Sequence, residues 1–385
     1  MTKDAVRWTL PATLVVFLVM LALVSAPPLA RTPIAHGASS PVLSQVGTYQ
    51  VPEDPFTVAA GDMNGNGHQD IVVSNYTAGT VSILANRGDG TFDEPQSYPS
   101  GSGTFGVALV DLDGDGDLDV AAANQRGNTL SILFNQGNGV LESRTDMTAG
   151  SSPHTVTVAD FNGNSLPDIA VPNYHARSVS VFYNLGNGQF SERETFPTQE
   201  APFSALAVDL NGDGLADIVT TSYQTGLLDV LWNDGSGDFT SRSAFEVGGS
   251  LWSVANADLT GNGAQDLIVT EYDSGTVSVM FNGGDGTLAA GSEIHTGGDG
   301  PCWAAPFDMN ADGRLDIAVV DASTHLLYVF VNEGGGSFRL DAEFETGRGP
   351  SSITVADFTG NGRDDLAVAN WESDNVVVFP FKDAN

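Results

Sequence analysis

From residue 43 onward, the chain repeats one pattern in which apolar and polar residues alternate over short stretches. Residues 70–75, 80–84 and 155–159 are three such stretches, rich in β-branched residues and bounded by Gly, Asn and Asp. Stretches of this kind are typical of strands joined by tight turns. The 3.6-residue period of an amphipathic helix is absent from residue 43 onward. The pattern therefore predicts an all-β chain.

An acidic nine-residue loop recurs along the chain at an almost constant spacing. The first Asp residues of its seven copies are 49, 49, 49, 49, 50 and 49 residues apart. Each repeat holds four strand-like stretches, because a further one follows the Asn-x-Gly-x-Gly turn that ends the third. Four short strands per repeat are typical of one blade of a β-propeller. We therefore expect a seven-bladed β-propeller of four-stranded antiparallel blades over residues 43–385.

The last repeat lacks a fourth strand of its own. Its third stretch covers residues 376–381, and residues 43–50 align with the fourth strand of the other repeats. We expect residues 43–50 to pair with residues 376–381 and to close the ring. Closure removes exposed strand edges. Because one blade cannot bury both of its faces, stability is expected to be a property of the whole ring.

Each acidic loop carries side-chain oxygens at its positions 1, 3, 5 and 9, and six of the seven loops have Gly at position 6. Asp and Asn oxygens around a sharp turn suit Ca²⁺, which takes six to eight oxygen ligands. Position 7 varies freely, which suits a ligand from the backbone carbonyl. The alternative is that Asp and Asn serve only as turn formers. The expected ligands are Asp62, Asn64, Asn66, Asp70, Asp111, Asp113, Asp115, Asp119, Asp160, Asn162, Asn164, Asp168, Asp209, Asn211, Asp213, Asp217, Asp258, Thr260, Asn262, Asp266, Asp308, Asn310, Asp312, Asp316, Asp357, Thr359, Asn361 and Asp365.

The number of carboxylates distinguishes the seven loops. Aspartates at positions 1, 3, 5 and 9 number 2, 4, 2, 3, 2, 3 and 2 in chain order. We expect up to seven Ca²⁺ ions, with the tightest at residues 111–119. Loop three should be weaker, because Ser165 replaces Gly at position 6 and a left-handed backbone costs a non-Gly residue about 1 kcal/mol or more. Loops five and seven carry Thr260 and Thr359 at position 3, which are weaker ligands.

The first forty residues differ from the rest of the chain. Lys3 and Arg7 precede an apolar run over residues 10–26, and a small, Pro-rich stretch follows. This order predicts an export signal over residues 1–37, with residues 38–42 as a linker. At about 17 residues the run is near the lower limit for a membrane span, so a cleaved signal peptide and an uncleaved anchor both stay open. Either one predicts a secreted, cell-surface or periplasmic protein.

The charge balance excludes several kinds of partner. The chain has 14 Lys and Arg against 48 Asp and Glu, which gives a net charge of −34. Nucleic-acid binding needs clustered basic residues, so it is excluded. Anionic membrane surfaces are excluded for the same reason, apart from a possible N-terminal anchor. The single cysteine, Cys302, rules out an intramolecular disulfide, and we expect a monomer.

The acidic loop, preceded by Val-Ala and followed by Ile or Leu and then Val, is seen at residues 158–171 and 355–368. This unit resembles the FG-GAP and VCBS repeats of integrin-alpha-like seven-bladed propellers, over residues 43–385. The resemblance implies that the loops join the first and second strands of each blade and hold Ca²⁺ on one face of the ring. Departures at Ser165, Ala311, Thr260 and Thr359 leave their loops in question. A partner is not implied, because one fold hosts many functions.

Two sets of residues, mostly aromatic, recur six positions before and fourteen positions after the first Asp of each loop. We expect both sets near one rim, on the face opposite the metal. Exposed aromatic rings stack on sugars or anchor a protein partner, and the alternative is that they pack between blades. The candidate ligand-binding residues are Phe56, Tyr76, Phe105, Tyr174, Phe203, Tyr223, Trp252, Tyr272, Trp303 and Trp371.

The common motifs of hydrolases and phosphate-binding enzymes, such as H-E-x-x-H and G-x-S-x-G, are absent from the sequence. We therefore expect a non-catalytic extracellular binding module for a glycan or a protein partner, without catalytic residues. The alternative is a lyase-like enzyme that acts on polysaccharides. In that case, a base and an anchoring cation on the rim of blade three would come from His154, Tyr174, His175 and Arg177.

Overall fold

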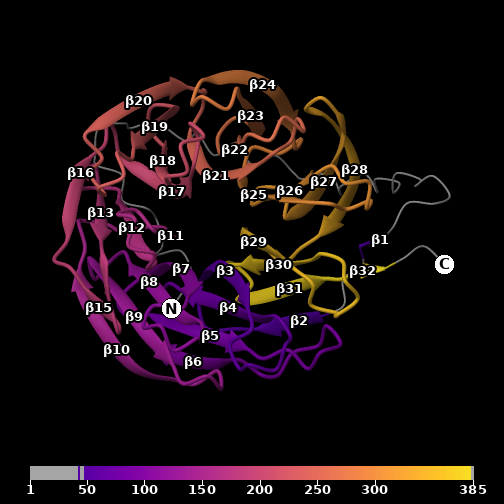
Figure 1. Ribbon diagram of the computed structural model, residues 1–385. Helices are drawn as coiled ribbons and strands as arrows, with labels where there is room; N and C mark the ends of the chain where they lie inside the picture. Colours follow the sequence, from indigo (N-terminus) through magenta and orange to yellow (C-terminus); the bar gives the residue numbers. More distant parts are fainter. Residues whose placement is uncertain (1–41, 44–46, 383–385) are drawn as a thin grey trace, which may run out of the picture. The chain divides into compact units, whose positions relative to one another are not determined.

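The computed structural model describes residues 42–43 and 47–382. The predicted export signal, and most of the linker that follows it, lie outside the described residues. The prediction of an all-β propeller is confirmed, because seven four-stranded antiparallel sheets are arranged as blades around a ring (Figure 1). Within the described ranges the chain forms strands and turns, and none of it forms a helix long and apolar enough to cross a membrane.

Each blade has the same strand order from the centre of the ring outward. The innermost strands are β3 (Pro55–Gly61), β7 (Thr104–Val110), β11 (Thr157–Ala159), β17 (Pro202–Val208), β21 (Leu251–Ala257), β25 (Pro301–Phe307) and β29 (Pro350–Ala356). The second strands are β4 (Asp70–Asn75), β8 (Asp119–Asn124), β12 (Asp168–Asn173), β18 (Asp217–Ser222), β22 (Asp266–Glu271), β26 (Asp316–Asp321) and β30 (Asp365–Asn370).

The third strands are β5 (Thr80–Leu84), β9 (Thr129–Asn135), β13 (Ser178–Phe182), β19 (Leu227–Trp232), β23 (Thr276–Asn282), β27 (Leu326–Gly334) and β31 (Asn375–Phe379). The outer strands of blades one to six are β6 (Gln96–Pro99), β10 (Leu141–Thr148), β16 (Glu194–Pro197), β20 (Ser241–Glu246), β24 (Leu288–His295) and β28 (Ser337–Glu345). The remaining strands form two two-stranded sheets: β14 (Asn184–Gly186) pairs with β15 (Gln189–Phe190), and β1 (Val42–Leu43) pairs with β32 (Phe381–Lys382).

The apolar core lies between neighbouring blades. Every residue of the seven second strands is buried, whereas outer strands such as β10 are mostly exposed. Ile71 and Val73 of blade one, for example, belong to one buried cluster with Phe358 and Val376 of blade seven. Each blade therefore buries its faces against its two neighbours, so the ring, rather than the single blade, is the stable unit.

The outer strand of blade seven comes from the start of the described chain. Strand β2 (Gly47–Gln50) pairs with β31, with Gly47 opposite Val378 and Gln50 opposite Asn375. Side chains reinforce the junction between blades seven and one, because the Val58 amide donates to Ser352 Oγ at 2.9 Å. The first and last repeats thus share one sheet, and residues 44–46 of the predicted closing segment lie outside the described residues.

A glycine in the outer turn of one blade covers an aromatic side chain of the preceding blade. A Cβ atom on Gly286 would lie 2.7 Å from the Trp232 ring, and one on Gly188 would lie 2.8 Å from Phe134. Gly286 also has a φ of +80°, a left-handed conformation that disfavours any other residue. The second Gly of the Asn-x-Gly-x-Gly turn therefore allows both the turn and the close contact between blades.

We expect the Gly286→Ala variant to be destabilised by about 1–3 kcal/mol more than Gly297→Ala, because the added methyl group has no room beside Trp232. Gly297 is the matched control, since it has the same φ of +80° and nothing within 4 Å of an added Cβ. Urea unfolding followed by tryptophan fluorescence measures both variants. Equal losses of stability would show that backbone strain alone, and not the contact between blades, fixes this glycine.

Candidate functional site

The seven acidic loops lie at equivalent places in the seven blades. Each loop connects the innermost strand to the second strand, as from Gly61 at the end of β3 to Asp70 at the start of β4. Because all seven sheets share one strand order, the loops lie on one face of the ring. In chain order, loops one to seven are residues 62–70, 111–119, 160–168, 209–217, 258–266, 308–316 and 357–365.

The aspartate at position 9 anchors its loop to the blade. In loop one, Asp70 is fully buried, and its Oδ2 and Oδ1 atoms accept the Met63 amide at 2.9 Å and the Asn86 amide at 2.7 Å. The same pair of hydrogen bonds recurs in all seven loops. Position 9 was predicted only as a metal ligand, and the sequence pattern gave no sign of this second role.

Burial makes the charge of these anchoring carboxylates unfavourable. Burial raises the pKa of Asp119, Asp217 and Asp316 to about 6, although two backbone amides oppose the shift in each case. Neighbouring loop aspartates make a smaller contribution to these raised pKa values. The loops therefore concentrate negative charge in partly desolvated surroundings, and a bound cation would relieve it.

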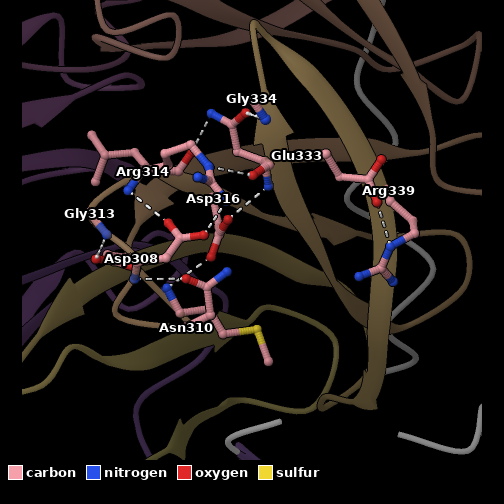
Figure 2. Close-up of polar contacts among 12 residues, drawn as sticks. Asp308, Asn310, Gly313, Arg314, Asp316, Glu333, Gly334 and Arg339 are labelled. Atoms are coloured by element: carbon pink, nitrogen blue, oxygen red, sulfur yellow. Dashed lines mark hydrogen bonds and ion pairs between the residues drawn. The ribbon is translucent and has the colours of Figure 1, made fainter. Parts of the chain in front are cut away.

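Positions 1, 3 and 5 wind the loop around its own backbone. Figure 2 shows loop six, in which the Asp308 carboxylate accepts the Asp312 amide at 3.2 Å and the Gly313 amide at 2.9 Å. Asn310 Oδ1 accepts the Asp312 amide at 2.9 Å, and Asp312 Oδ1 accepts the Arg314 amide at 2.9 Å. Each side-chain oxygen thus turns inward to a backbone amide two to five residues later.

The donor set of these loops fits a hard cation. In loop two, carboxylate oxygens of Asp111, Asp113 and Asp115 lie within 4.8 Å of one another, the one such convergence among the described residues. In loops five and seven, the hydroxyl oxygens of Thr260 and Thr359 are buried and have no hydrogen-bond partner within the described part of the chain. Close carboxylates and unpartnered oxygens at position 3 suit Ca²⁺, which prefers oxygen ligands.

Most of the predicted ligand-binding aromatic residues meet at the centre of the ring. Phe56, Tyr76, Phe105 and Phe203 form a buried cluster, and Tyr174, Tyr223 and Trp252 pack against it. The ring centroids of Phe56 and Phe105 are 3.8 Å apart, and those of Phe203 and Trp252 are 4.2 Å apart. We call these seven residues the central aromatic cluster. Its members come from blades one to five, so they contact one another across the middle of the propeller.

The aromatic set divides into a packed part and a surface part. Phe56, Tyr76, Phe105 and Phe203 are at most 7% exposed, so they serve the core. The other six residues are partly exposed, and they belong to blades three to seven. Trp252 joins the two parts, because its ring centroid lies 4.2 Å from that of the buried Phe203 and 4.7 Å from that of Tyr272. The partly exposed residues, which we call the aromatic rim, are Tyr174, Tyr223, Trp252, Tyr272, Trp303 and Trp371.

His154 lies inside the central aromatic cluster and not on the rim where the enzyme alternative placed it. It is 2% exposed and stacks between Phe105 and Tyr174, with centroids 4.6 and 5.2 Å away. Burial, with a smaller contribution from the nearby His175, lowers the pKa of His154 to about 3. Periodicity placed His154 in register with Phe105 and Phe203 but could not show how deeply it is buried. Its exposed neighbours His175 and Arg177 remain at the surface.

A family model described as an FG-GAP-like repeat matches six overlapping segments of the chain, residues 62–122, 111–171, 166–220, 209–269, 258–319 and 308–368. The segments span well over half of the 385 residues. The chain belongs to the FG-GAP-like repeat family. A sequence search of curated proteins finds no match for this FG-GAP-like repeat protein.

Solved structures share the fold of this FG-GAP-like repeat protein at low sequence identity. BBS1N, crystallised in complex with ARL6DN, is 9% identical with a TM-score of 0.65, over 88% of this chain and 96% of that chain. A lectin from Agrocybe aegerita that recognises non-reducing terminal N-acetylglucosamine is 19% identical with a TM-score of 0.54, over 87% of this chain and 96% of that chain. At these identities the likeness concerns the fold alone.

Two loops of the FG-GAP-like repeat protein keep their shape without the expected glycine. Ser165 at position 6 of loop three and Ala311 at position 4 of loop six have φ values of +65° and +57°. The predicted left-handed backbone at Ser165 is therefore present. The Ser165 amide still donates to Asp160 Oδ2 at 2.7 Å, so the hydrogen bonds of the loop offset the strain. In loop six, the Arg314 guanidinium contacts the Asp312 carboxylate and places a cation of the chain's own there.

We expect His154 to make the protein less stable in acid. The folded protein keeps this imidazole neutral down to about pH 3, whereas the unfolded chain binds a proton below about pH 6.5. Protonation of the unfolded chain therefore lowers the free energy of unfolding as pH falls from about 6.5 towards 3, by up to about 1.4 kcal/mol per pH unit. The His154→Phe variant should lack this loss of stability in acid, because Phe does not titrate. Phe should fit at this site, since Phe stands at the equivalent positions 56, 105 and 203.

Urea unfolding of the wild type and the His154→Phe variant between pH 7 and pH 4 measures the loss of stability that is due to His154. The difference between the two proteins isolates His154, because the aspartates titrate alike in both. A difference in unfolding free energy that stays constant with pH would contradict the prediction.

Proposed function

We propose that this protein is an exported, calcium-stabilised and non-catalytic binding module, whose aromatic rim recognises an extracellular glycan or protein. The observation that carries the proposal is the separation of chemistry between the two faces. Acidic loops occupy one face, and on the other face the partly exposed Tyr174, Tyr223 and Trp252 pack at the centre of the ring, with Tyr272 stacked on Trp252. Partly exposed aromatic rings are typical of surfaces that stack on sugars or anchor a partner.

Calcium is the cation that the loops favour. Their 18 aspartates at positions 1, 3, 5 and 9 supply hard oxygen ligands, and neither His nor Cys occupies these positions. Loop two, with four aspartates, is the strongest candidate, and Asp111, Asp113 and Asp115 would contribute side-chain oxygens there. Bound Ca²⁺ would lower the repulsion among carboxylates that the fold holds close together.

A glycan is the first candidate for the partner. Polar groups accompany the rim, as where Gln224 Nε2 donates to the Tyr174 hydroxyl at 3.1 Å. Stacking surfaces edged by amides and hydroxyls suit uncharged sugars, and a chain with a net charge of −34 would repel acidic ones. The lectin with the same fold recognises a sugar, whereas BBS1N was crystallised with a protein partner, and these neighbours support either class.

The proposal of a module without catalysis draws support from His154. A base that acts on a polysaccharide must reach its substrate, and the buried imidazole of His154 is closed in by Phe105 and Tyr174. Its lowered pKa also makes it a weak base. The enzyme alternative would then depend on the exposed His175 and Arg177, which lie two residues apart in one turn.

Removal of calcium should lower the melting temperature. A site held at a hundredfold excess over its dissociation constant contributes about 2.7 kcal/mol, and several sites contribute together. Differential scanning calorimetry in about 5 mM calcium and in excess chelator measures the shift in melting temperature. Asp111→Ala should reduce the shift more than Asp160→Ala, because loop two has four aspartates at the ligand positions and loop three has two. A melting curve unchanged by chelator would refute calcium binding.

A glycan array with and without calcium tests the partner. We expect binding to uncharged sugars, a loss of at least about tenfold in affinity for the Trp371→Ala variant, and no loss for Leu185→Ala. Leu185 is a fitting control because it is 63% exposed and follows Asn184, whose amide bonds to loop two on the opposite face. Silence across all sugars would reject the glycan and leave a protein as the partner. Turnover of any sugar would overturn the non-catalytic proposal.

A further inference from the structure

A buried asparagine joins each of six loops to the loop of the preceding blade. Asn135, at the end of the third strand of blade two, is 1% exposed. Its Nδ2 atom donates to the Met63 carbonyl of loop one at 2.7 Å and to the Leu118 carbonyl of loop two at 3.0 Å. Its backbone amide donates to Asp119 Oδ1 at 2.8 Å. One residue therefore contacts two neighbouring loops.

The same connection recurs around the ring. In each case the asparagine opens the Asn-x-Gly-x-Gly turn and donates to the carbonyl at position 2 of the preceding loop. The pairs, with their Nδ2 to O distances, are Asn86 to Phe358 at 2.8 Å, Asn135 to Met63 at 2.7 Å, Asn184 to Leu112 at 2.9 Å, Asn233 to Phe161 at 2.9 Å, Asn282 to Leu210 at 2.8 Å and Asn332 to Leu259 at 2.9 Å.

The junction between blades six and seven uses a different residue for the same bond. Phe381 occupies the place of the asparagine there. An Arg363 guanidinium nitrogen donates instead to the Met309 carbonyl of loop six at 3.2 Å. The guanidinium also lies over the Phe381 ring, 3.6 Å from its centroid. A side-chain donor thus bridges all seven junctions, although the residue type changes at one of them.

The bridge reaches the anchoring carboxylates on both sides. In loop one, the Met63 amide donates to Asp70 while the Met63 carbonyl accepts from Asn135. In loop two, the Asn135 amide donates to Asp119. A loop ordered by a cation would hold its position 2 peptide in place and would therefore fix the asparagine that the next loop needs. The next loop then loses less conformational entropy when it binds its own cation.

We propose that these six asparagines and Arg363 are positioning residues, which couple cation binding at each loop to cation binding at its neighbours. The inference rests on the calcium-binding part of the proposed function. Coupling of this kind is reciprocal, so loop one must influence loop two as strongly as loop two influences loop one. The bridge also predicts where coupling is strongest, namely between adjacent loops and not across the ring.

Hydrogen exchange with mass spectrometry tests the coupling in the full chain. In saturating calcium, Asp111→Ala removes a ligand from loop two, and it should speed exchange of the loop one amides, residues 62–70, by about fivefold or more. In an Asn135→Ala background, Asp111→Ala should have no further effect on loop one. Asn282→Ala is the matched control, because it removes the same bonds between loops four and five and should leave the effect on loop one intact.

The outcomes separate this inference from calcium binding itself. If calcium does not slow exchange in loop two of the wild type, calcium binding fails. If calcium protects loop two but Asp111→Ala leaves loop one unchanged, the coupling is overturned and calcium binding stands. An equal effect of Asp111→Ala with and without Asn135 also overturns it. Should Asn135→Ala not fold, Asp62→Ala in the otherwise native chain must speed exchange of loop two by the same factor, and its failure to do so counts against the coupling.

Discussion

A buried carboxylate with two backbone partners is the interaction on which the acidic face depends. Burying a charge is costly unless hydrogen bonds compensate for the water that is lost. Asp70 and its six equivalents offset part of this cost by accepting one amide from the start of the loop and one from a residue at or just beyond the end of the third strand. Each anchor thereby fixes three segments of a blade relative to one another. The oxygens at positions 1, 3 and 5 can gather over a small volume because the two ends of the loop are held.

This anchor also shapes the ring as a whole. The residue at or just beyond the end of the third strand that donates to it is, in six blades, the asparagine whose side chain reaches the preceding blade. The packing between blades and the geometry of the loops are therefore set by the same residues. Because every anchor stands at the same end of its sheet, the negative charge of the loops gathers on one face. On the other face, the side chains of the central aromatic cluster approach one another at the centre of the ring.

The sequence was sufficient to predict the repeated parts of the molecule, because each is a local pattern that recurs. The strand order, the position of the loops and the left-handed backbone at Ser165 follow from residues within one repeat. The depth at which a side chain is buried, and the residues of other repeats that it contacts, do not follow from one repeat. Phe105 and Tyr174 belong to equally regular sets, yet Phe105 is fully buried and Tyr174 is partly exposed, because side chains from other blades determine how far each is covered. The partner of Asn135 lies 72 residues away, so no local signal marks the bond.

The central aromatic cluster shows how a repeat protein can place an uneven surface on an even frame. Blades six and seven have Cys302 and Ser351 where other blades have larger rings. Cys302 Sγ donates to the Pro350 carbonyl at 3.1 Å, and Ser351 Oγ donates to the Pro55 carbonyl at 3.2 Å, so each small residue bonds to the next blade. Rings from only five blades then fill the middle. Phe56 of blade one and Trp252 of blade five stack on each other, with centroids 6.5 Å apart, so the aromatic rings are distributed unevenly within a nearly symmetric ring.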